Sequence, residues 1–212
     1  MTEPKSVNDV KLIIYGCGGH ARSVANVALK KYLQNQILLL DENAVDGEKI
    51  LGCSVKREYT LLENQGYIVA IGDNLKRKKL YETLLRGQAG KPESVISEQA
   101  DIGWKAKIER GTFVASGTHI GPEAWIGEDT IINTGSVIEH EAMIGNHTHI
   151  APHVTICGRS RIGDNVFCGA GSIVIDKITV CNNVIIGAGA VVKEDILEAG
   201  TYVGVPATKI RA

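Results

Sequence analysis

The chain has 212 residues, 22% of them charged and 44% hydrophobic, which is the composition of a folded protein rather than a disordered one. Its net charge of −1 provides no basic field for a phosphate backbone, so we expect no nucleic acid as partner. No apolar run approaches the roughly 20 residues of a membrane-spanning helix and no signal peptide is visible, so we expect no membrane partner. Five cysteines without a CxxC pair indicate neither a disulfide framework nor a zinc knuckle, which favours a cytoplasmic protein.

Short apolar runs and helical patterns alternate in the first part of the chain. We expect buried strands at residues 11–15, 37–40 and 67–71, and helices at residues 21–32 and 75–86. Strands that alternate with helices form a parallel sheet. Residues 1–92 are therefore predicted to form a small Rossmann-like α/β domain.

A six-residue repeat occupies the second part of the chain, predicted as a separate domain over residues 93–212. Ile or Val stands at sixteen of seventeen positions spaced six apart from Ile96 to Val192, and the fifth position of a hexad is Ala, Ser or Thr in twelve of seventeen. This period is not helical; it indicates short strands joined by equivalent bends, with each coil stacked on the last. The aliphatic residues would fill a narrow interior, which accounts for the 24 glycines and the scarcity of aromatic residues.

A glycine-rich segment, Gly16 to Ala21, follows the first expected strand and opens the first expected helix. It reads as G-x-G-x-x-A, a pattern in which glycines let a phosphate approach the backbone N–H groups of a helix N-terminus. Asp41 and Glu42 end the second strand, where a carboxylate would bind a ribose. One small α/β domain suits one nucleotide diphosphate rather than a dinucleotide. A tight turn that uses glycine only for its geometry remains the alternative.

The hexads resemble those of the hexapeptide-repeat acyltransferases. The resemblance implies a left-handed parallel β-helix with three hexads in each coil, a homotrimer, and an acyl-CoA groove between neighbouring β-helices. The glycine loop, Asn133, the segment Ile138 to Glu141 and the segment Gly204 to Ala207 extend the likeness over about residues 11–210. Together they resemble the nucleotide-activated 4-amino-sugar N-acetyltransferases, such as UDP-N-acetylbacillosamine N-acetyltransferase, and the sialic acid O-acetyltransferase-like proteins of the same architecture.

This resemblance implies an enzyme that transfers an acetyl group from acetyl-CoA to the 4-amino group of a dTDP- or UDP-linked 4-amino-4,6-dideoxyhexose. The product would serve bacterial surface glycan synthesis, such as that of the lipopolysaccharide O-antigen. The sequence alone leaves the nucleotide base, the sugar epimer and the acyl chain open.

The resemblance also assigns roles to individual residues. It implies His140 as the catalytic base and Glu141 as the carboxylate that orients it, and we expect a backbone N–H such as that of Gly158 to stabilise the oxyanion. The implied substrate-binding residues are Gly18, Gly19, His20, Asp41, Glu42, Gly72, Asp73 and Asn133. The implied acetyl-CoA-binding residues are His149, Gly158, Ala170 and Ala188.

Several rival interpretations start from the same residues. A zinc-dependent β-helix hydratase would use the cluster of His140, His147, His149 and His153, but no pair of these differs by the 18 residues of one coil, so we expect no metal. The outward position of His140 would also suit a surface histidine. Cys157 and Cys168 are expected to be small interior or groove residues rather than nucleophiles. Sugar O-acetylation and non-catalytic nucleotide-sugar binding complete the alternatives.

Overall fold

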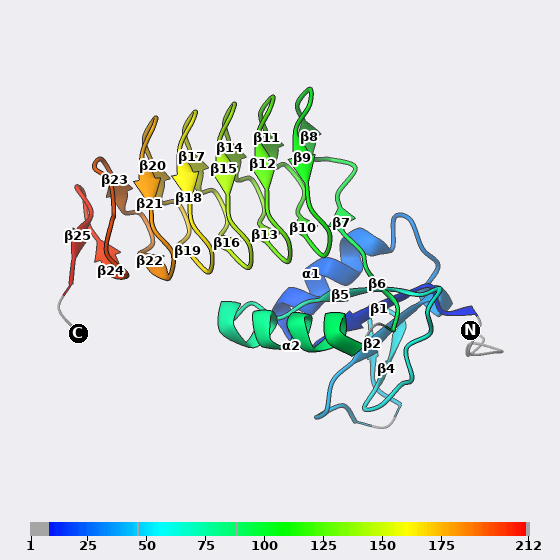
Figure 1. The fold of residues 1–212 in the computed structure, drawn as a ribbon. Helices are drawn as coiled ribbons and strands as arrows, with labels where there is room; N and C mark the ends of the chain where they lie inside the picture. Colours follow the sequence, from blue (N-terminus) through cyan, green and yellow to red (C-terminus); the bar gives the residue numbers. More distant parts are fainter. Residues whose placement is uncertain (1–8, 46, 88, 211–212) are drawn as a thin grey trace. The chain divides into compact units, whose positions relative to one another are not determined.

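A computed structural model of the chain describes residues 9–45, 47–87 and 89–210. The chain divides between Ile96 and Ser97 into two compact units (Figure 1). The boundary expected from the sequence lies between residues 92 and 93. In the described part of the chain no helix has the length and apolarity that a membrane span needs.

The N-terminal unit contains a six-stranded sheet of order β3-β4-β2-β1-β5-β6, parallel throughout except that β3 runs antiparallel to β4. Its strands are β1 (Leu12–Tyr15), β2 (Ile37–Leu40), β3 (Lys49–Ile50), β4 (Cys53–Lys56), β5 (Gly66–Val69) and β6 (Lys91–Pro92). The expected strands correspond to β1, β2 and β5. Strands β3, β4 and β6 were not expected, because β3 and β6 have only two residues each and β4 alternates more and less buried positions instead of forming an apolar run.

The unit also has two α-helices, α1 (Gly19–Ala28) and α2 (Asn74–Gly87), a short 3₁₀ turn η2 (Gln34–Gln36), and a final strand β7 (Val95–Ile96). The first expected helix was too long, because α1 ends at Ala28 and the chain continues to Tyr32 in turns. From α2, Tyr81 packs on every second residue of the central strands, including Ile13, Leu38 and Tyr67. The sheet is thus buried under helical side chains, and its ends stay open for a site.

The order of the strands creates a crevice at one edge of this sheet. From the central strand β1, the chain continues to β2 on one side and returns to β5 on the other. At such a switch point the loops that follow the strands diverge, and ligands of α/β proteins bind there, beyond the carboxyl ends of the strands. The loops after β1, β2 and β5 are the ones that carry the glycine segment, Asp41 and Gly72.

The C-terminal unit is a solenoid whose parallel strands form three sheets (Figure 1). The β8 sheet contains β8 (Asp101–Ile102), β11 (His119–Ile120), β14 (Val137–Ile138), β17 (Thr155–Ile156), β20 (Ile173–Val174) and β23 (Val191–Val192). The β9 sheet contains β9 (Lys107–Ile108), β12 (Trp125–Ile126), β15 (Met143–Ile144), β18 (Arg161–Ile162) and β21 (Thr179–Val180). The β10 sheet contains β10 (Phe113–Val114), β13 (Ile131–Ile132), β16 (His149–Ile150), β19 (Phe167–Cys168), β22 (Val184–Ile186), β24 (Gly200–Val203) and β25 (Thr208–Lys209), of which β25 alone is antiparallel to its neighbour.

Each coil of the solenoid is one strand of each sheet, as the hexads imply. Paired residues lie 18 apart, as in Ile120 with Ile138 and Ile138 with Ile156. The first-position aliphatics from Val114 to Val192 are buried in one continuous core. The expectation was wrong for Ile96 and Ile102, which are 40% and 39% exposed. Ile102 lies in the first coil of the solenoid, where no preceding coil of the unit covers it.

The glycines at the second hexad position permit close approach between coils rather than unusual backbone angles. At Gly121, for example, an added Cβ would lie 2.6 Å from the backbone nitrogen of His140 in the next coil. The left-handed residue of the bend is glycine in most coils at one corner, as at Gly135, with His153 as the exception; at the other two corners it is a charged or polar residue in most coils, as at Glu141 and His147, with Gly111 as the exception. Polar side chains therefore project from two of the three corners.

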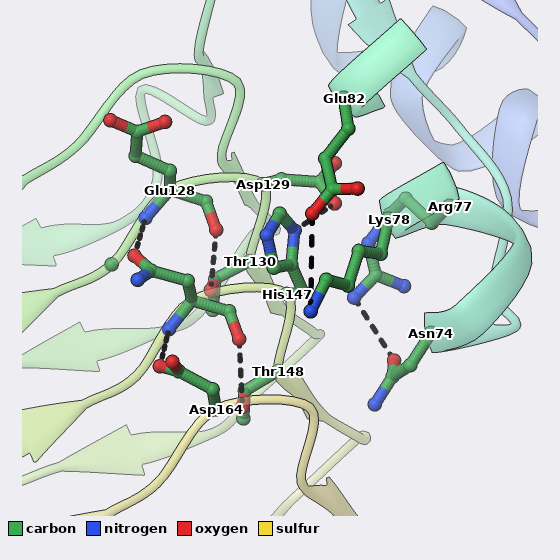
Figure 2. A network of polar contacts seen from close by, with 12 residues as sticks. Asn74, Arg77, Lys78, Glu82, Glu128, Asp129, Thr130, His147, Thr148 and Asp164 are labelled. Atoms are coloured by element: carbon green, nitrogen blue, oxygen red, sulfur yellow. Dashed lines mark hydrogen bonds and ion pairs between the residues drawn. The ribbon is translucent and has the colours of Figure 1, made fainter. Parts of the chain in front are cut away.

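The corner between the β9 and β10 sheets is held by a ladder of polar side chains. The backbone N–H of Glu128 donates to Oδ1 of Asn146, and that of Asn146 donates to Oδ1 of Asp164 (2.9 and 2.7 Å). At the same corner Nδ1 of His147 lies 2.8 Å from Oδ2 of the fully buried Asp129 (Figure 2). These contacts hold successive coils in register.

Candidate active site

The glycines that follow β1 fall into two groups. At Gly16 the φ angle is +116° and an added Cβ would lie 3.0 Å from the carbonyl oxygen of Ala70, so the fold itself requires glycine. At Gly18, Gly19 and Gly72 the φ angles are ordinary and a Cβ would meet nothing within 4 Å. The tight-turn explanation therefore accounts for Gly16 only, and the space around the other three is open, at the start of α1 for Gly18 and Gly19 and before α2 for Gly72.

Asp41 lies at the end of β2 as a fixed, ionised carboxylate. One oxygen accepts the backbone N–H of Cys17 (3.2 Å), and the other accepts that of Asn43 (2.9 Å). Burial raises the pKa of this carboxyl, but the hydrogen bonds from Asn43 and Cys17 outweigh it, so that the pKa lies below its usual value. Burial and the hydrogen bond to Asp41 in turn raise the pKa of the Cys17 thiol to about 11, so this cysteine stays neutral in the loop.

A pocket of about 500 Å³ opens at the carboxyl ends of the central strands. Its wall contains the expected Asp41 and Glu42 and the first glycine of the expected phosphate loop, Gly16, and the remaining residues of the wall were not expected. The further lining residues are Tyr15, Leu40, Asn43, Arg57, Glu58, Tyr59, Ile71 and Leu80. Arg57 to Tyr59 follow β4, and the alternation of Cys53 and Val55 with polar residues was the signal that could have revealed that strand.

The other expected nucleotide-side residues lie outside the wall of this pocket. His20 is the second residue of α1, and Gly72 precedes α2. Oδ1 of Asp73 accepts the backbone N–H of Lys76 (2.9 Å) and so caps α2. Asp73 therefore stabilises the start of α2 whether or not a ligand is bound. The buried guanidinium of Arg77 donates to the carbonyl of Ile71 (3.1 Å) and to Oδ1 of Asn74 (3.0 Å, Figure 2) and thereby fixes the loop that contains Gly72.

In the solenoid, His140 and Glu141 lie at the corner between the β8 and β9 sheets. Nδ1 of His140 is 3.0 Å from Oε2 of Glu141, and the two side chains are 43% and 50% exposed. An ionised carboxylate accepts a hydrogen bond, so this contact places the proton of neutral imidazole on Nδ1. Nε2 then has its lone pair available as a base.

Gly158 lies one coil beyond His140 at the same corner. An added Cβ here would lie 2.6 Å from both Cε1 and Nε2 of His140, so only glycine leaves room for the imidazole in this position. The N–H groups of Cys157 and Arg159 on either side donate to Val174 and His140 carbonyls. The N–H of Gly158 itself donates to no acceptor among the described residues. The reactive nitrogen of His140 and an available backbone donor therefore lie side by side.

The remaining expected residues do not join this group within one chain. Asn133, Ala170 and Ala188 lie at the corner between the β10 and β8 sheets, and Oδ1 of Asn133 accepts the N–H of Thr134 (2.8 Å). His149 lies on β16 of the β10 sheet, 9% exposed and edge-on to Phe167 at 5.2 Å between ring centroids. The structure of one chain thus separates the expected acetyl-CoA residues over two corners and one face.

Two cysteines of the solenoid have raised thiol pKa values. Cys168 is fully buried in the solenoid core, where burial raises its pKa to about 12. Burial, together with the negative charges of Glu139 and Asp176, raises the pKa of Cys157. Within residues 9–45, 47–87 and 89–210, no three His, Cys, Asp or Glu side chains are grouped as metal ligands would be.

The stacked hexads and their three-sheet coil define a hexapeptide-repeat β-helix protein. Residues 123–158 and 159–194 each match the family model of the bacterial transferase hexapeptide repeats. Residues 11–84 match that of the PglD N-terminal domain. The chain therefore combines a PglD N-terminal domain with bacterial transferase hexapeptide repeats.

Solved structures share this whole arrangement. A histidine-to-alanine mutant of GDP-perosamine N-acetyltransferase from Caulobacter crescentus, in complex with CoA and GDP-perosamine, is 28% identical; the match covers 95% of this chain and 97% of that chain, with a TM-score of 0.86. The acetyltransferase domain of PglB from Neisseria gonorrhoeae, in complex with acetyl coenzyme A, is 27% identical over 94% of this chain and 98% of that chain, with a TM-score of 0.83. WeeI from Acinetobacter baumannii, 17% identical over 95% of this chain and all of that chain at a TM-score of 0.56, shares the fold. A search of curated proteins found no match.

Proposed function

We propose that this protein is an N-acetyltransferase that uses acetyl-CoA to acetylate the 4-amino group of a nucleotide-linked 4-amino sugar. The observation that carries the proposal is the group formed by His140, Glu141 and Gly158, which provides an oriented base beside an available backbone N–H. Two structures with this architecture, each at least 27% identical, are an N-acetyltransferase with CoA and GDP-perosamine and an acetyltransferase domain with acetyl coenzyme A. The open glycine loop and the pocket beside Asp41 supply a place for the nucleotide.

The reaction follows from the geometry of the corner. The lone pair of the sugar amine attacks the thioester carbonyl carbon, and the carbonyl electrons move to oxygen, where the N–H of Gly158 stabilises the negative charge. Nε2 of His140 accepts a proton from the amine nitrogen as the new C–N bond forms. The tetrahedral adduct then collapses, the C–S bond breaks, and His140 returns the proton to the leaving CoA thiolate. Glu141 holds the imidazole in the required tautomer throughout.

The proposed activity predicts turnover with a definite set of substrates. Purified protein with acetyl-CoA and a panel of UDP-, dTDP- and GDP-linked 4-amino-4,6-dideoxyhexoses should release free thiol with at least one of them. The 4-hydroxy sugar nucleotide of the same base serves as the matched control, because it lacks the amine nucleophile. Acetylation of the hydroxy sugar but of no amino sugar would show an O-acetyltransferase instead.

We further propose that the active enzyme is a homotrimer. His140 and Gly158 occupy one corner of the coil and Ala170 and Ala188 another, which supports a CoA groove that is shared between two copies. In a closed ring of three copies, the first corner of each can face the second corner of its neighbour. Light scattering is expected to give about three times 22.7 kDa. A fully active monomer would contradict the shared groove.

The cellular setting that we propose is the bacterial cytoplasm, with the product used in surface glycan synthesis. All five cysteines are free in the structure, which suits a reducing compartment.

A further inference from the structure

The carboxyl ends of three neighbouring strands in the N-terminal unit, β1, β2 and β4, lie side by side. In this sheet β1 pairs with β2 and β2 pairs with β4; the terminal pairs are Tyr15 with Leu40 and Leu40 with Lys56. Neighbouring strands lie about 4.8 Å apart, which is close to the separation of successive groups in a nucleotide. If phosphate lies at the glycine loop after β1 and ribose at Asp41 after β2, the base lies over the end of β4. This step rests on the proposed function.

Arg57, the first residue after β4, forms the wall of the pocket at this third position. Its Nε donates to the carbonyl oxygen of Ala44 (2.6 Å), which fixes the plane of the guanidinium. The two terminal nitrogens donate to no acceptor in the described part of the chain, so they remain available to a ligand. A guanidinium fixed in this way presents two parallel N–H donors to paired acceptors.

The other charged groups of this wall are acidic. Both oxygens of Asp41 already accept backbone N–H groups. Glu42 and Glu58 are exposed, and their carboxylates form no hydrogen bond or ion pair with other described residues. Glu58 follows Arg57 in the chain and lines the same pocket. The paired N–H donors of the Arg57 guanidinium and the two carboxylate oxygens of Glu58 are therefore both available at the position expected for the base. A base that fits must offer paired acceptors and paired donors.

We propose that this pocket selects a guanine base, which Arg57 and Glu58 recognise. Guanine offers the acceptors O6 and N7, which a guanidinium binds bidentately. It also offers the donors N1–H and N2–H₂, which a carboxylate accepts. Uracil and thymine have a single N–H between two carbonyl oxygens, one of which would face the carboxylate and be repelled. The substrate of this enzyme is therefore a GDP-linked amino sugar.

The test measures calorimetric affinities of the full-length protein for GDP, UDP, dTDP and inosine diphosphate. Wild type is expected to bind GDP at least about 10-fold more tightly than the other three, since each bidentate contact discriminates by about 5- to 150-fold. Arg57→Gln should weaken GDP about 10- to 100-fold while changing UDP little. Glu58→Gln should abolish the preference for GDP over inosine diphosphate, which lacks the 2-amino group.

The control variant is Lys56→Gln, which removes an exposed charge one residue earlier, outside this pocket, and should leave all four affinities unchanged. Thermal melting checks that each variant folds. Tighter binding of UDP or dTDP than of GDP to the wild type would overturn the guanine assignment and leave the proposed acetyltransferase intact. Equal weakening of all diphosphates by Arg57→Gln would also overturn it. If no nucleoside diphosphate binds the wild type, both the assignment and the proposed function are wrong.

Discussion

His140→Ala is expected to lower kcat by about 10²- to 10⁴-fold, the usual contribution of a positioned general base. Nε2 of His140 is the proposed proton acceptor, at the same corner as the N–H of Gly158. The side chain is 43% exposed, so its removal should change the melting temperature little. Thiol release under saturating acetyl-CoA and amino-sugar nucleotide measures the effect.

His119→Ala is the matched control for this variant. His119 also pairs with a carboxylate, through Nδ1 and Oδ2 of Asp101 at 2.7 Å, but it lies on β11 outside the proposed site. It should retain wild-type kcat. If His140→Ala remains fully active while His149→Ala abolishes turnover, the base has been misidentified.

Gly158→Ala tests whether the location of His140, and not only its presence, matters. The added methyl group would lie 2.6 Å from the imidazole and must displace it. A displacement of about 1 Å can cost about 100-fold in rate. In a double-mutant cycle, Gly158→Ala should have little further effect once His140 is alanine, because the displaced group is then absent. Additive losses would contradict this, because the methyl group would then act without displacing His140.

Gly18→Val is expected to weaken sugar-nucleotide binding by about 100-fold or more while acetyl-CoA binding persists. No atom lies within 4 Å of a Cβ at Gly18, so the branched side chain can be accommodated in the folded protein. It would occupy the space that a diphosphate needs to reach the N–H groups at the start of α1. Loss of several charge-assisted hydrogen bonds, each contributing about 1.5–3 kcal/mol, accounts for the expected size.

Gly87→Val provides the comparison, because Gly87 ends α2 and is equally unobstructed. Calorimetry with both ligands should show normal binding by this control. Unchanged nucleotide affinity in Gly18→Val would refute the phosphate-loop assignment. Loss of both ligands in that variant would point to misfolding.

The repeating features of this protein could be predicted from local patterns of residues. Strands β1, β2 and β5 and the coils of the solenoid follow from short-range patterns, because a buried run or a six-residue period is a property of neighbouring residues. The glycine loop could be recognised for the same reason. Its two kinds of glycine could not be separated, because the contact of Gly16 with Ala70 arises from strands far apart in the chain.

The contacts between residues far apart in the chain could not be predicted and follow from the folded arrangement. His140 lies against Gly158 because a coil takes 18 residues to return to the same corner, whereas Ala170 and Ala188 fall at a different corner. Arg57 lines the same pocket as Asp41 because β4 pairs beside β2, and Asp73 caps a helix that begins at the next residue. Such contacts depend on strand pairing and coil closure over long separations, and the local pattern of apolar and polar residues does not encode them.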